Sequence, residues 1–580
     1  VIAADPLDDA YLAAAAGDDG AALTGAERVL AARPDRFEAA LLRGRLLLRR
    51  GGAMADADRL DDADAAFTAA DDAFTAAAAI AGSALDAHLG RCRLGTARLA
   101  LALQQTDARS FDADAFDARA VALVADADAA CQHARAIAPD HPRPPLDVAD
   151  LHLQHVRVRY LTGRRPTHAM YGAATTSAHI ARDQAVRVGA SMADAWRRLG
   201  DLDLLHGNIV QHLSYDDPRP FFDRAYAHHT RALRLDGHPL SQLAQVLVLS
   251  QRANYEISRL LPISTQLHLG LQLARQAHRQ LPGSTAAAAE IARFHTKLAV
   301  DAFLRGAVFG DHTAEALRHL RPLAQQASED ANLAILLCQV YNLEAGHRFY
   351  SGEDPDAILH ESRAHIERFL AIHSDHPAMM MLRIDLFYYA LLYSDLRDRS
   401  LATWLADYDE AINQPSSEQL HGIVEHRVLR AGFVLRQALR DGDDPAAAAR
   451  HLRMQLRERY AHVQQHTVAD FDVIEAHLWL TWLSLRQGER ARAASHLANL
   501  ADLFDDADDN HTMATAWTNV QRGAWHALRA RLAAEAELAA GVDAQRAEAR
   551  WARARDANPY VEPSIAFWRR WLARLDASTD

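Results

Sequence analysis

Helix-breaking residues recur along this chain at a nearly constant interval, and this regularity limits the folds open to it. Between the breaks, apolar residues recur at intervals of three and four, the pattern of helices that bury one face. No alternating pattern typical of strands is found. The breaks lie 45 to 50 residues apart, at Pro139, Gly189, Gly237, Pro282, Ser328 and Pro377. This period predicts an all-α chain built from repeated helical units.

Composition and charge exclude several classes of protein. The 580 residues exceed what one core usually organises, which predicts several domains or a repeat array. At 49% hydrophobic and 24% charged residues, the chain is too apolar to be disordered. Its net charge of −13 argues against nucleic acid as a partner, because binding phosphates requires a basic face. No apolar run approaches about 18 residues, so we expect no membrane span in this sequence.

The clearest repeat unit runs from Trp196 to Gly237. Its segment Trp196–Gly200 (WRRLG) matches the W-x2-L-G opening of a tetratricopeptide repeat, and Ala225, Ala232 and Gly237 have the spacing of the second helix and closing turn. The two halves lie about 13 residues further apart than in the standard unit of about 34. The sequence therefore predicts a right-handed solenoid of helical hairpins with a repeat of about 47 residues.

Two other stretches repeat the spacing of that second helix. Small residues at its first and third positions let antiparallel helices approach closely, and Pro or Gly ends it. The stretches consist of Ala127, Cys131, Ala134 and Pro139, and of Ala547, Trp551, Ala554 and Pro559.

Asp-Pro turns precede several predicted second helices, where Pro fits the first turn and the Asp carboxylate can accept from free N–H groups. They are Asp217-Pro218, Asp354-Pro355 and Asp444-Pro445. The D-P-R-P turn before an Ala-rich helix, inside elongated tetratricopeptide units, resembles the C-terminal repeat regions of bacterial Hanks-type serine/threonine kinases. The resemblance covers about residues 120–570.

This resemblance implies that a kinase domain precedes the repeats, often with one membrane helix between, and that the repeats act as a sensor or docking surface. The chain itself has no G-x-G-x-x-G, V-A-I-K, H-R-D or D-F-G motif. Lys297, its only lysine, lies in a helical pattern and cannot be the strand lysine that pairs ATP phosphates. The start at Val1, without an initiator Met or a signal-like stretch, predicts a cut fragment or a mature form.

The resemblance also implies which residues face the concave groove of the solenoid. Arg197 lies between Asp194 at i−3 and Asp201 at i+4, which predicts a guanidinium held extended toward a partner carboxylate. The alternative is a solvated ion pair within the helix. The implied groove residues are Asp194, Arg197, Asp201 and Leu204 in the clearest unit and Ser241, Ala244, Val248 and Gln251 in the next.

No catalytic residue, metal site or cofactor is predicted. The run Asp505–Asp509 could be the D-D-x-x-D magnesium site of an all-α isoprenoid synthase, but an acidic turn between helices is the favoured interpretation. The histidines form no H-E-x-x-H motif, and no G-x-S-x-G elbow is present. Cys92, Cys131 and Cys338 are odd in number and far apart, so no disulfide framework can be read from them.

Aromatic residues gather at Phe387–Tyr389 with Tyr393, and at Trp568 and Trp571 near the end. We expect them to fill the grooves between helices, with the last group sealing the terminal repeat. A ligand cage is the alternative.

Charge distribution suggests the domain organisation. Residues 1–150 hold 25 Asp and Glu against 15 Arg, whereas the remainder is nearly balanced. The predicted parts are acidic, Ala-rich helical repeats over 1–150, the long-unit solenoid over 151–559, and a capping helix over 560–580.

The sequence thus predicts a non-enzymatic sensor or protein-interaction region of a bacterial serine/threonine kinase, which relays binding of a protein, peptide or small ligand to the kinase. A free-standing scaffold or adaptor is the alternative, and an all-α magnesium-dependent enzyme using Asp505–Asp509 is a remote one. A homodimer is compatible with this interpretation. The periplasm is slightly favoured over the cytoplasm.

Overall fold

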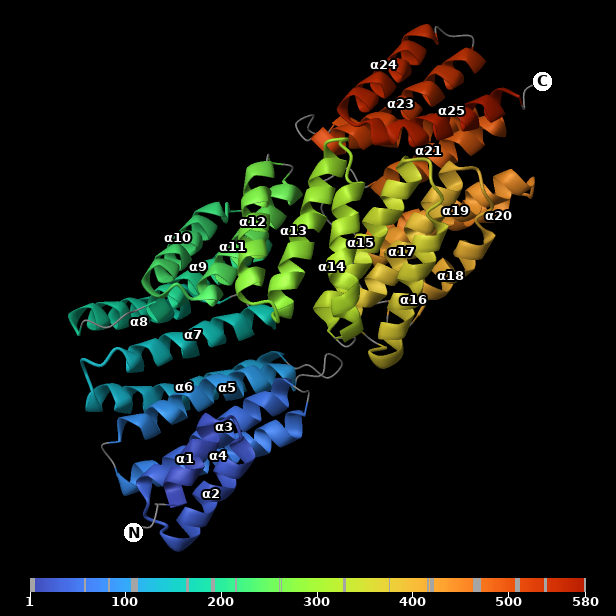
Figure 1. The fold of residues 1–580 in the computed structure, drawn as a ribbon. Helices are drawn as coiled ribbons and strands as arrows, with labels where there is room; N and C mark the ends of the chain where they lie inside the picture. Colours follow the sequence, from blue (N-terminus) through green and yellow to red (C-terminus); the bar gives the residue numbers. More distant parts are fainter. Residues whose placement is uncertain are drawn as a thin grey trace. The chain divides into compact units, whose positions relative to one another are not determined.

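The computed structural model describes residues 6–577. Within that range it leaves out 57–58, 82–83, 106–112, 163–165, 189–192, 214–215, 260, 262, 327–329, 375, 415–416, 418–421, 463–470, 506–511 and 537–539. The described residues are helical nearly throughout and contain no strand. The all-α prediction is confirmed, and Figure 1 shows the helices arranged as successive antiparallel hairpins.

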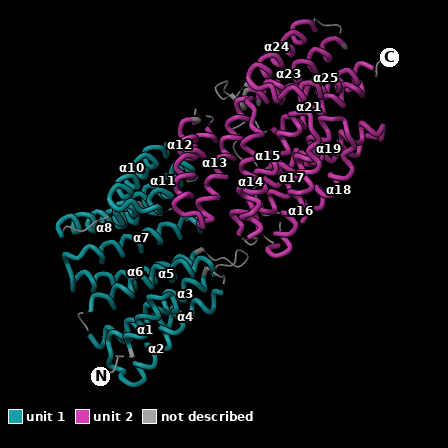
Figure 2. Tube along the Cα trace, in the orientation of Figure 1, with its two compact units in different colours: residues 1–252 teal, residues 253–580 magenta. Residues whose placement is uncertain are grey.

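The chain divides into two compact units, residues 1–252 (unit 1) and 253–580 (unit 2), which Figure 2 shows in different colours. In unit 1 each odd-numbered helix pairs with the next even one, and successive odd-numbered helices contact one another. Its helices are α1 (Pro6–Ala15), α2 (Asp19–Ala32), α3 (Phe37–Asp56), α4 (Leu60–Ile80), α5 (Leu85–Gln104), α6 (Ala113–Ile137), α7 (Arg143–Leu161), α8 (His168–Arg187), α9 (Ala193–Leu213) and α10 (Arg219–Asp236).

Unit 2 continues the same pattern from α13 onward, and α11 (Pro239–Ser258) contains the boundary residue. A short 3-10 helix, η2 (Pro559–Val561), precedes the last helix. The other helices are α12 (Ser264–Gln280), α13 (Thr285–Leu304), α14 (Gly310–Gln326), α15 (Ala331–Tyr350), α16 (Asp356–Ile372), α17 (Pro377–Leu396), α18 (Ala402–Ile412), α19 (Ile423–Asp441), α20 (Ala446–His462), α21 (Phe471–Arg486), α22 (Arg490–Asp505), α23 (Thr512–Glu535), α24 (Gly541–Ala557) and α25 (Glu562–Asp576).

The repeat period is nearly the predicted one. The first helices α9, α11, α13, α15, α17 and α19 begin at residues 193, 239, 285, 331, 377 and 423, so each begins 46 residues after the previous one. The chain is therefore a tetratricopeptide-like helical solenoid with long units. The predicted breaks at Gly189 and Ser328 lie outside the described residues. The division at residues 150 and 559 stays a prediction.

Small residues allow the helices of each hairpin to approach as the motif predicts. Ala225 and Ala232 on α10 expose no surface. A side chain at Gly200 on α9 would lie 2.5 Å from Nε2 of His229, so the α10 imidazole fills the space that Gly200 leaves. The predicted pairing of α9 with α10 is thus confirmed. Ala547 and Ala554 are buried in the same way on α24.

The Asp-Pro turns start helices as predicted. The carboxylate of Asp217 accepts a hydrogen bond from the backbone N–H of Arg219, at 3.0 Å, where α10 begins. Asp354 and Asp444 accept in the same way before α16 and α20, at 3.2 and 3.0 Å. Each carboxylate satisfies one of the N–H groups that a helix leaves free in its first turn.

The structure contains a disulfide that the sequence analysis did not find. Cys92 on α5 is bonded to Cys131 on α6, with Cα atoms 5.2 Å apart. The two cysteines are 39 residues apart in the sequence but adjacent in space, because α5 and α6 form one hairpin. Cys338 remains a free thiol, and burial raises its pKa to about 12.

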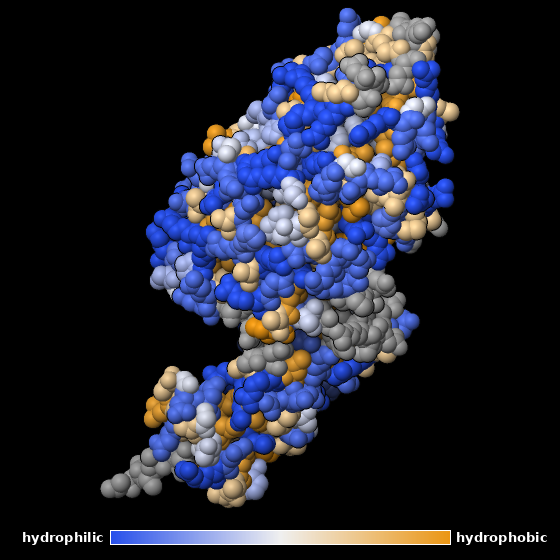
Figure 3. Space-filling model, turned by 90° about the vertical axis from the view of Figure 1, so that its right-hand side faces the viewer, coloured by the Kyte–Doolittle hydropathy of each residue, from blue (hydrophilic) through white to orange (hydrophobic). Residues whose placement is uncertain are grey.

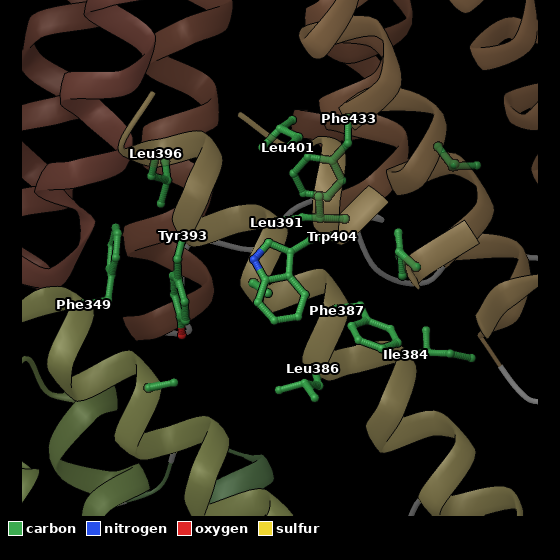
Figure 4. Packing of buried hydrophobic residues seen from close by; sticks show 14 of the residues in the cluster. Phe349, Ile384, Leu386, Phe387, Leu391, Tyr393, Leu396, Leu401, Trp404 and Phe433 are labelled. Carbon is green, nitrogen blue, oxygen red and sulfur yellow. The ribbon is translucent and has the colours of Figure 1, made fainter. Parts of the chain in front are cut away.

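A single large hydrophobic cluster extends from α13 to α25 in unit 2. Trp479, Trp482 and Trp571 are almost completely buried in it, so the expectation that Trp571 packs between helices is confirmed. Figure 4 shows part of this cluster, in which the rings of Phe349 and Tyr393 lie face to face with centroids 4.6 Å apart.

Hydrophilic residues cover most of the face drawn in Figure 3, and hydrophobic residues form smaller areas on it. Among the described helices, none is long and apolar enough to cross a membrane.

Candidate functional site

The predicted groove residues on α9 take part in a network of ion pairs. Arg197 donates to the carboxylates of Asp194 and Asp236 and, at 3.1 Å, to the hydroxyl of Ser241. Asp201, which was expected to flank Arg197, instead accepts from Arg198 at 3.0 Å. The predicted pair of Arg197 with Asp194 is confirmed, whereas the pair with Asp201 was wrong, because α10 ends beside α9 and brings Asp236 to Arg197.

The eight predicted groove residues fall into a buried group and a partly exposed group. Ser241 exposes no surface and Val248 only 1%, so both are part of the packing of α11. The remaining six are at least partly exposed: Asp194, Arg197, Asp201, Leu204, Ala244 and Gln251. A binding role for this set stays a prediction.

A larger feature lies within unit 2, where the first helices surround a cavity of about 990 Å³. Helices α13, α15 and α17 supply most of its wall, and α23 and α25 contribute aromatic side chains. This volume is at the upper end of the range of about 300–1,000 Å³ found for ligand pockets. The cavity is therefore the strongest candidate for a functional site.

Tyrosines and phenylalanines form much of the cavity wall. Tyr350, Tyr389 and Tyr393 line it together with Phe303. The Tyr389 and Tyr393 rings are stacked at 6.1 Å, and Tyr350 lies 5.7 Å from Phe303. Burial raises the pKa of Tyr389 to about 12, so its hydroxyl keeps its proton at neutral pH and can donate a hydrogen bond.

Two basic residues on α13 face the cavity. Lys297 is 9% exposed, and burial lowers its pKa to about 8, against the opposing effect of Glu290. Arg293 lies one turn earlier and pairs with Glu290 at 3.5 Å. This wall thus carries a buried ammonium group whose positive charge is disfavoured by its surroundings.

An acidic residue lines the cavity on α17. Burial raises the pKa of the Asp385 carboxyl to about 6. A carboxylate oxygen of Asp385 lies 3.5 Å from Nε2 of His426 on α19. Burial lowers the pKa of His426 to about 4, so this imidazole is neutral at pH 7 and does not neutralise the carboxylate. The described residues provide no Arg or Lys partner for Asp385 within 4.0 Å.

The other charges at the cavity compensate one another. Nε of Arg436 lies 2.6 Å from the carboxylate of Asp395, and its Nη1 donates to Glu475 at 3.4 Å. The guanidinium also lies over Phe433 and Trp479, with ring centroids 4.3 and 5.0 Å away. This group holds α17, α19 and α21 together.

Amide side chains supply further polar groups. Asn332 and Gln339 on α15 line the cavity and are exposed in it. Oδ1 of Asn342 and Nε2 of Gln521 are buried and have no hydrogen-bond partner among the described residues. Because leaving a buried polar atom unpaired costs free energy, these atoms indicate places where a ligand or water can bind.

The C-terminal segment closes back on the start of unit 2. The amide of Asn558 donates to the carbonyl oxygens of Phe303 and Leu304, at 2.9 and 3.4 Å. The hydroxyl of Tyr560 donates to the carbonyl of Ala307 at 2.9 Å, and its ring stacks on Phe303. These contacts join residues more than 250 positions apart in the sequence.

This closure depends on a glycine and on contacts along α25. Gly306 has a φ of +68°, and a Cβ there would lie 2.4 Å from Cδ of Pro559. Further along, Arg570 donates to the carbonyl of Leu396 at the end of α17, at 2.6 Å. Figure 1 shows α25 beside α21 and α23. The last helix is therefore part of the wall around the cavity.

Sequence reasoning missed this site, although its signals are visible. Tyr388, Tyr389, Tyr393 and Trp568 were expected to fill grooves between helices, but all four line the cavity, whereas Phe387 is fully buried. Lys297, the chain's only lysine, was noted only as evidence against a kinase. Asp385 carries no recognisable motif.

Metal binding finds no support in the described part of the chain, where no group of three or more His, Cys, Asp or Glu residues could hold an ion. The acidic run Asp505–Asp509 lies outside the residues whose side chains are described.

The chain was compared with known proteins and solved structures. No family model and no curated protein matches this chain. Among solved structures, a human IFIT1 dimer with m7Gppp-AAAA is 12% identical, with a TM-score of 0.35 over 78% of this chain and 88% of that one. Yeast Tom70 is 12% identical, with a TM-score of 0.29 over 85% of this chain and 99% of that one.

A third match, Naa15/Naa10 bound to HypK-THB, is 13% identical, with a TM-score of 0.21 over 98% of this chain and 80% of that one. Identities and TM-scores this low carry no argument about function. The description of the fold therefore depends on the helices of this chain and their contacts, and not on these matches.

Proposed function

We propose that this chain is a non-enzymatic binding protein whose cavity in unit 2 holds a peptide or an extended segment of a partner protein. The supporting observation is that α13, α15 and α17 present amide and aromatic side chains to one cavity of about 990 Å³. Side-chain amides can both donate to and accept from a peptide backbone. Aromatic rings offer large apolar surfaces to its side chains.

A peptide selection tests this proposal. Random heptapeptides displayed on phage would be selected on the full chain, and the selected peptides synthesised and titrated by calorimetry. Gln339→Trp fills the cavity from an exposed position on α15. Arg318→Trp is the control, because Arg318 is 68% exposed on α14 and does not line the cavity.

We expect Gln339→Trp to weaken binding of the selected peptides at least about tenfold, a change of about 1.4 kcal/mol. The control should bind them as the parent chain does. Equal binding by both variants would place the peptide site elsewhere, and a selection that yields no binding peptide would contradict the proposal.

We further propose that binding is relayed to a serine/threonine kinase encoded in the same gene. This finer proposal is supported by the resemblance of the Asp-Pro turns and long repeats to kinase repeat regions. The alternative is a free-standing adaptor with the same cavity. The reading frame upstream of the codon for Val1 decides between them, since only the first requires kinase motifs there.

An extracytoplasmic location is also proposed. The Cys92–Cys131 disulfide supports it, because structural disulfides persist mainly in oxidising compartments. Alkylation of free thiols in intact cells, followed by mass spectrometry without reduction, tests it. A labelled Cys92 or Cys131 would contradict the proposal.

A further inference from the structure

The cavity of unit 2 carries charges of opposite sign on two different helices. Lys297 lies on α13 and Asp385 on α17, with α15 between them, and both line the same cavity. Both groups lie in surroundings that disfavour their charged forms. A ligand that brings a negative group to α13 and a positive group to α17 would stabilise both charges.

Charged and aromatic groups surround both residues. At Lys297, Glu290 raises the pKa and Arg293 lowers it, and the ammonium nitrogen lies 5.8 Å from the ring centroid of Phe294. Around Asp385, the neighbouring His426 is neutral at pH 7. Tyr389 on α17 and Tyr408 on α18 also lie near Asp385, and both keep their protons because burial raises their pKa values.

The space between the two charges suits an apolar chain. Leu336, Gln339 and Leu343 line the cavity from α15, the helix between α13 and α17. Asn342 on the same helix adds a buried carbonyl oxygen without a partner. The middle of a ligand would thus meet apolar side chains and an acceptor for a backbone N–H.

The helix spacing limits the ligand's length. Packed helix axes lie about 8–10 Å apart, so side chains on α13 and α17 can meet the ends of a ligand roughly 10–20 Å long. An extended peptide rises about 3.3–3.6 Å per residue. A peptide of about three to five residues fits this distance.

We infer that the cavity selects a short peptide with free ends, binding its carboxylate at Lys297 and its ammonium group at Asp385. This inference rests on the proposed function and names the chemistry of its ligand. A segment inside a longer chain lacks both terminal charges, so short free peptides are distinguished from partner proteins.

Four forms of one tetrapeptide test the inference. Ala-Phe-Leu-Ala would be titrated by calorimetry into the full chain with both ends free, with an acetylated amino end, with an amidated carboxyl end, and with both ends blocked. Hydrogen bonds in which one partner is charged are about twice as strong as those between neutral groups. We therefore expect each single block to weaken binding about tenfold or more.

Two variants test which residue binds which end of the peptide. Lys297→Gln should bind the free and amidated forms equally while still preferring a free amino end. Asp385→Asn should bind the free and acetylated forms equally while still preferring a free carboxyl end. Arg318→Gln, on the exposed surface of α14, should behave as the parent chain does.

Proton exchange gives an independent signature. A bound carboxylate should raise the pKa of Lys297 from about 8, so binding near pH 8 should take up protons. A bound ammonium group should lower the pKa of Asp385 from about 6, so binding near pH 6 should release them. Titrations in two buffers with different ionisation enthalpies measure both effects. The peptide's own amino group also titrates near pH 8, so the uptake is measured with the acetylated peptide, for which Lys297→Gln should abolish it.

The outcomes separate this inference from the proposed function. Equal affinity for all four forms would overturn the inference and leave the cavity as a site for internal segments. No binding of any form at millimolar concentration would also overturn it, and the phage-selected heptapeptides would then decide the proposed function independently. If both variants distinguish the four peptide forms as the parent chain does, residues other than Lys297 and Asp385 bind the peptide ends.

Discussion

The two units use different side chains to hold their helices. In unit 1 the hydrophobic clusters are small and separate, and α4 and α8 pack mainly through alanine. In unit 2 one cluster runs from α13 to α25 and contains the largest buried rings. Small residues let neighbouring helices pack closely, so unit 1 depends on local contacts. Aromatic residues and the returning C-terminal segment instead connect distant repeats and surround a cavity.

The two units also differ in the surroundings of their charged side chains. In unit 1, Arg197 is satisfied by Asp194, Asp236 and Ser241 of its own chain. In unit 2, Asp385 has no such cationic partner among the described residues, and Lys297 lines a cavity. The Arg197 guanidinium, which the sequence suggested as a binding group, thus forms ion pairs within the fold, while the two charges proposed to bind a ligand lie on helices without any motif.

The largest expected effect is on unit 2. Trp571→Ala should lower the free energy of unfolding by about 3–5 kcal/mol, because it leaves a cavity beside Trp479 and Trp482. Hydrogen exchange followed by mass spectrometry should show lost protection in α17 and α21 and none in α3 and α4. Trp196→Ala, in the α9–α10 hairpin, is the control, and its effect should remain in unit 1. Equal losses of protection in both units would refute the difference in connectivity.

Removal of the disulfide should affect unit 1 by about 2–4 kcal/mol. Replacing Cys92 and Cys131 with serine releases a loop of 39 residues between α5 and α6. Urea unfolding, with the two units followed separately by hydrogen exchange, measures the change. Cys338→Ser, in unit 2, serves as the control for loss of a thiol. An unchanged unit 1 would show that helix packing alone fixes this hairpin.

Acid should weaken unit 2 by protonating buried imidazoles. Burial lowers the pKa values of His477 and His496 to about 4, below the value of about 6.5 for an unfolded chain. Between these values the unfolded state binds more protons, so stability falls as pH falls from 6.5 toward 4. The loss for His477 is on the order of 2 kcal/mol at pH 4.5.

The measurement is urea unfolding at several pH values. His477→Gln should flatten the pH dependence below pH 6.5, although it also loses the contact with Tyr460 at 3.0 Å. An unchanged slope in that variant would assign the acid sensitivity to other groups.

The smallest effect is expected at Arg197. Arg197→Glu places a carboxylate beside Asp194 and Asp236 and should cost unit 1 about 1–2 kcal/mol. The sequence alone paired Arg197 only with residues of α9, whereas the structure adds Asp236 and Ser241. Arg187→Glu, at a position 64% exposed, should change the melting temperature little. Calorimetric scans of both variants distinguish a structural ion pair from a free surface charge.

The repeat register could be predicted because its signals are local. Gly200, Ala225 and Ala232 report close helix approach, and each Asp-Pro turn caps the helix that directly follows it. The predicted period of 47 residues differs by one residue from the 46 observed from α9 to α19.

The cavity could not be predicted because it depends on contacts between distant residues. Tyr560 packs on Phe303, and Arg570 reaches the end of α17. No local pattern in the sequence indicates that the C-terminal segment returns to α13. The Arg197–Asp236 pair was missed for the same reason, since it requires the position of α10 beside α9.

The return of the C-terminal segment to α13 also limits how this protein can evolve. Repeat proteins commonly lengthen or shorten when a unit is duplicated or deleted in the gene. In unit 1 such an event adds or removes a module that touches only its neighbours. In unit 2 an extra 46-residue unit between α13 and α21 would separate Asn558 from its acceptors and open the wall. We therefore expect related proteins to keep the same number of repeats in unit 2 and to differ in the number of repeats in unit 1.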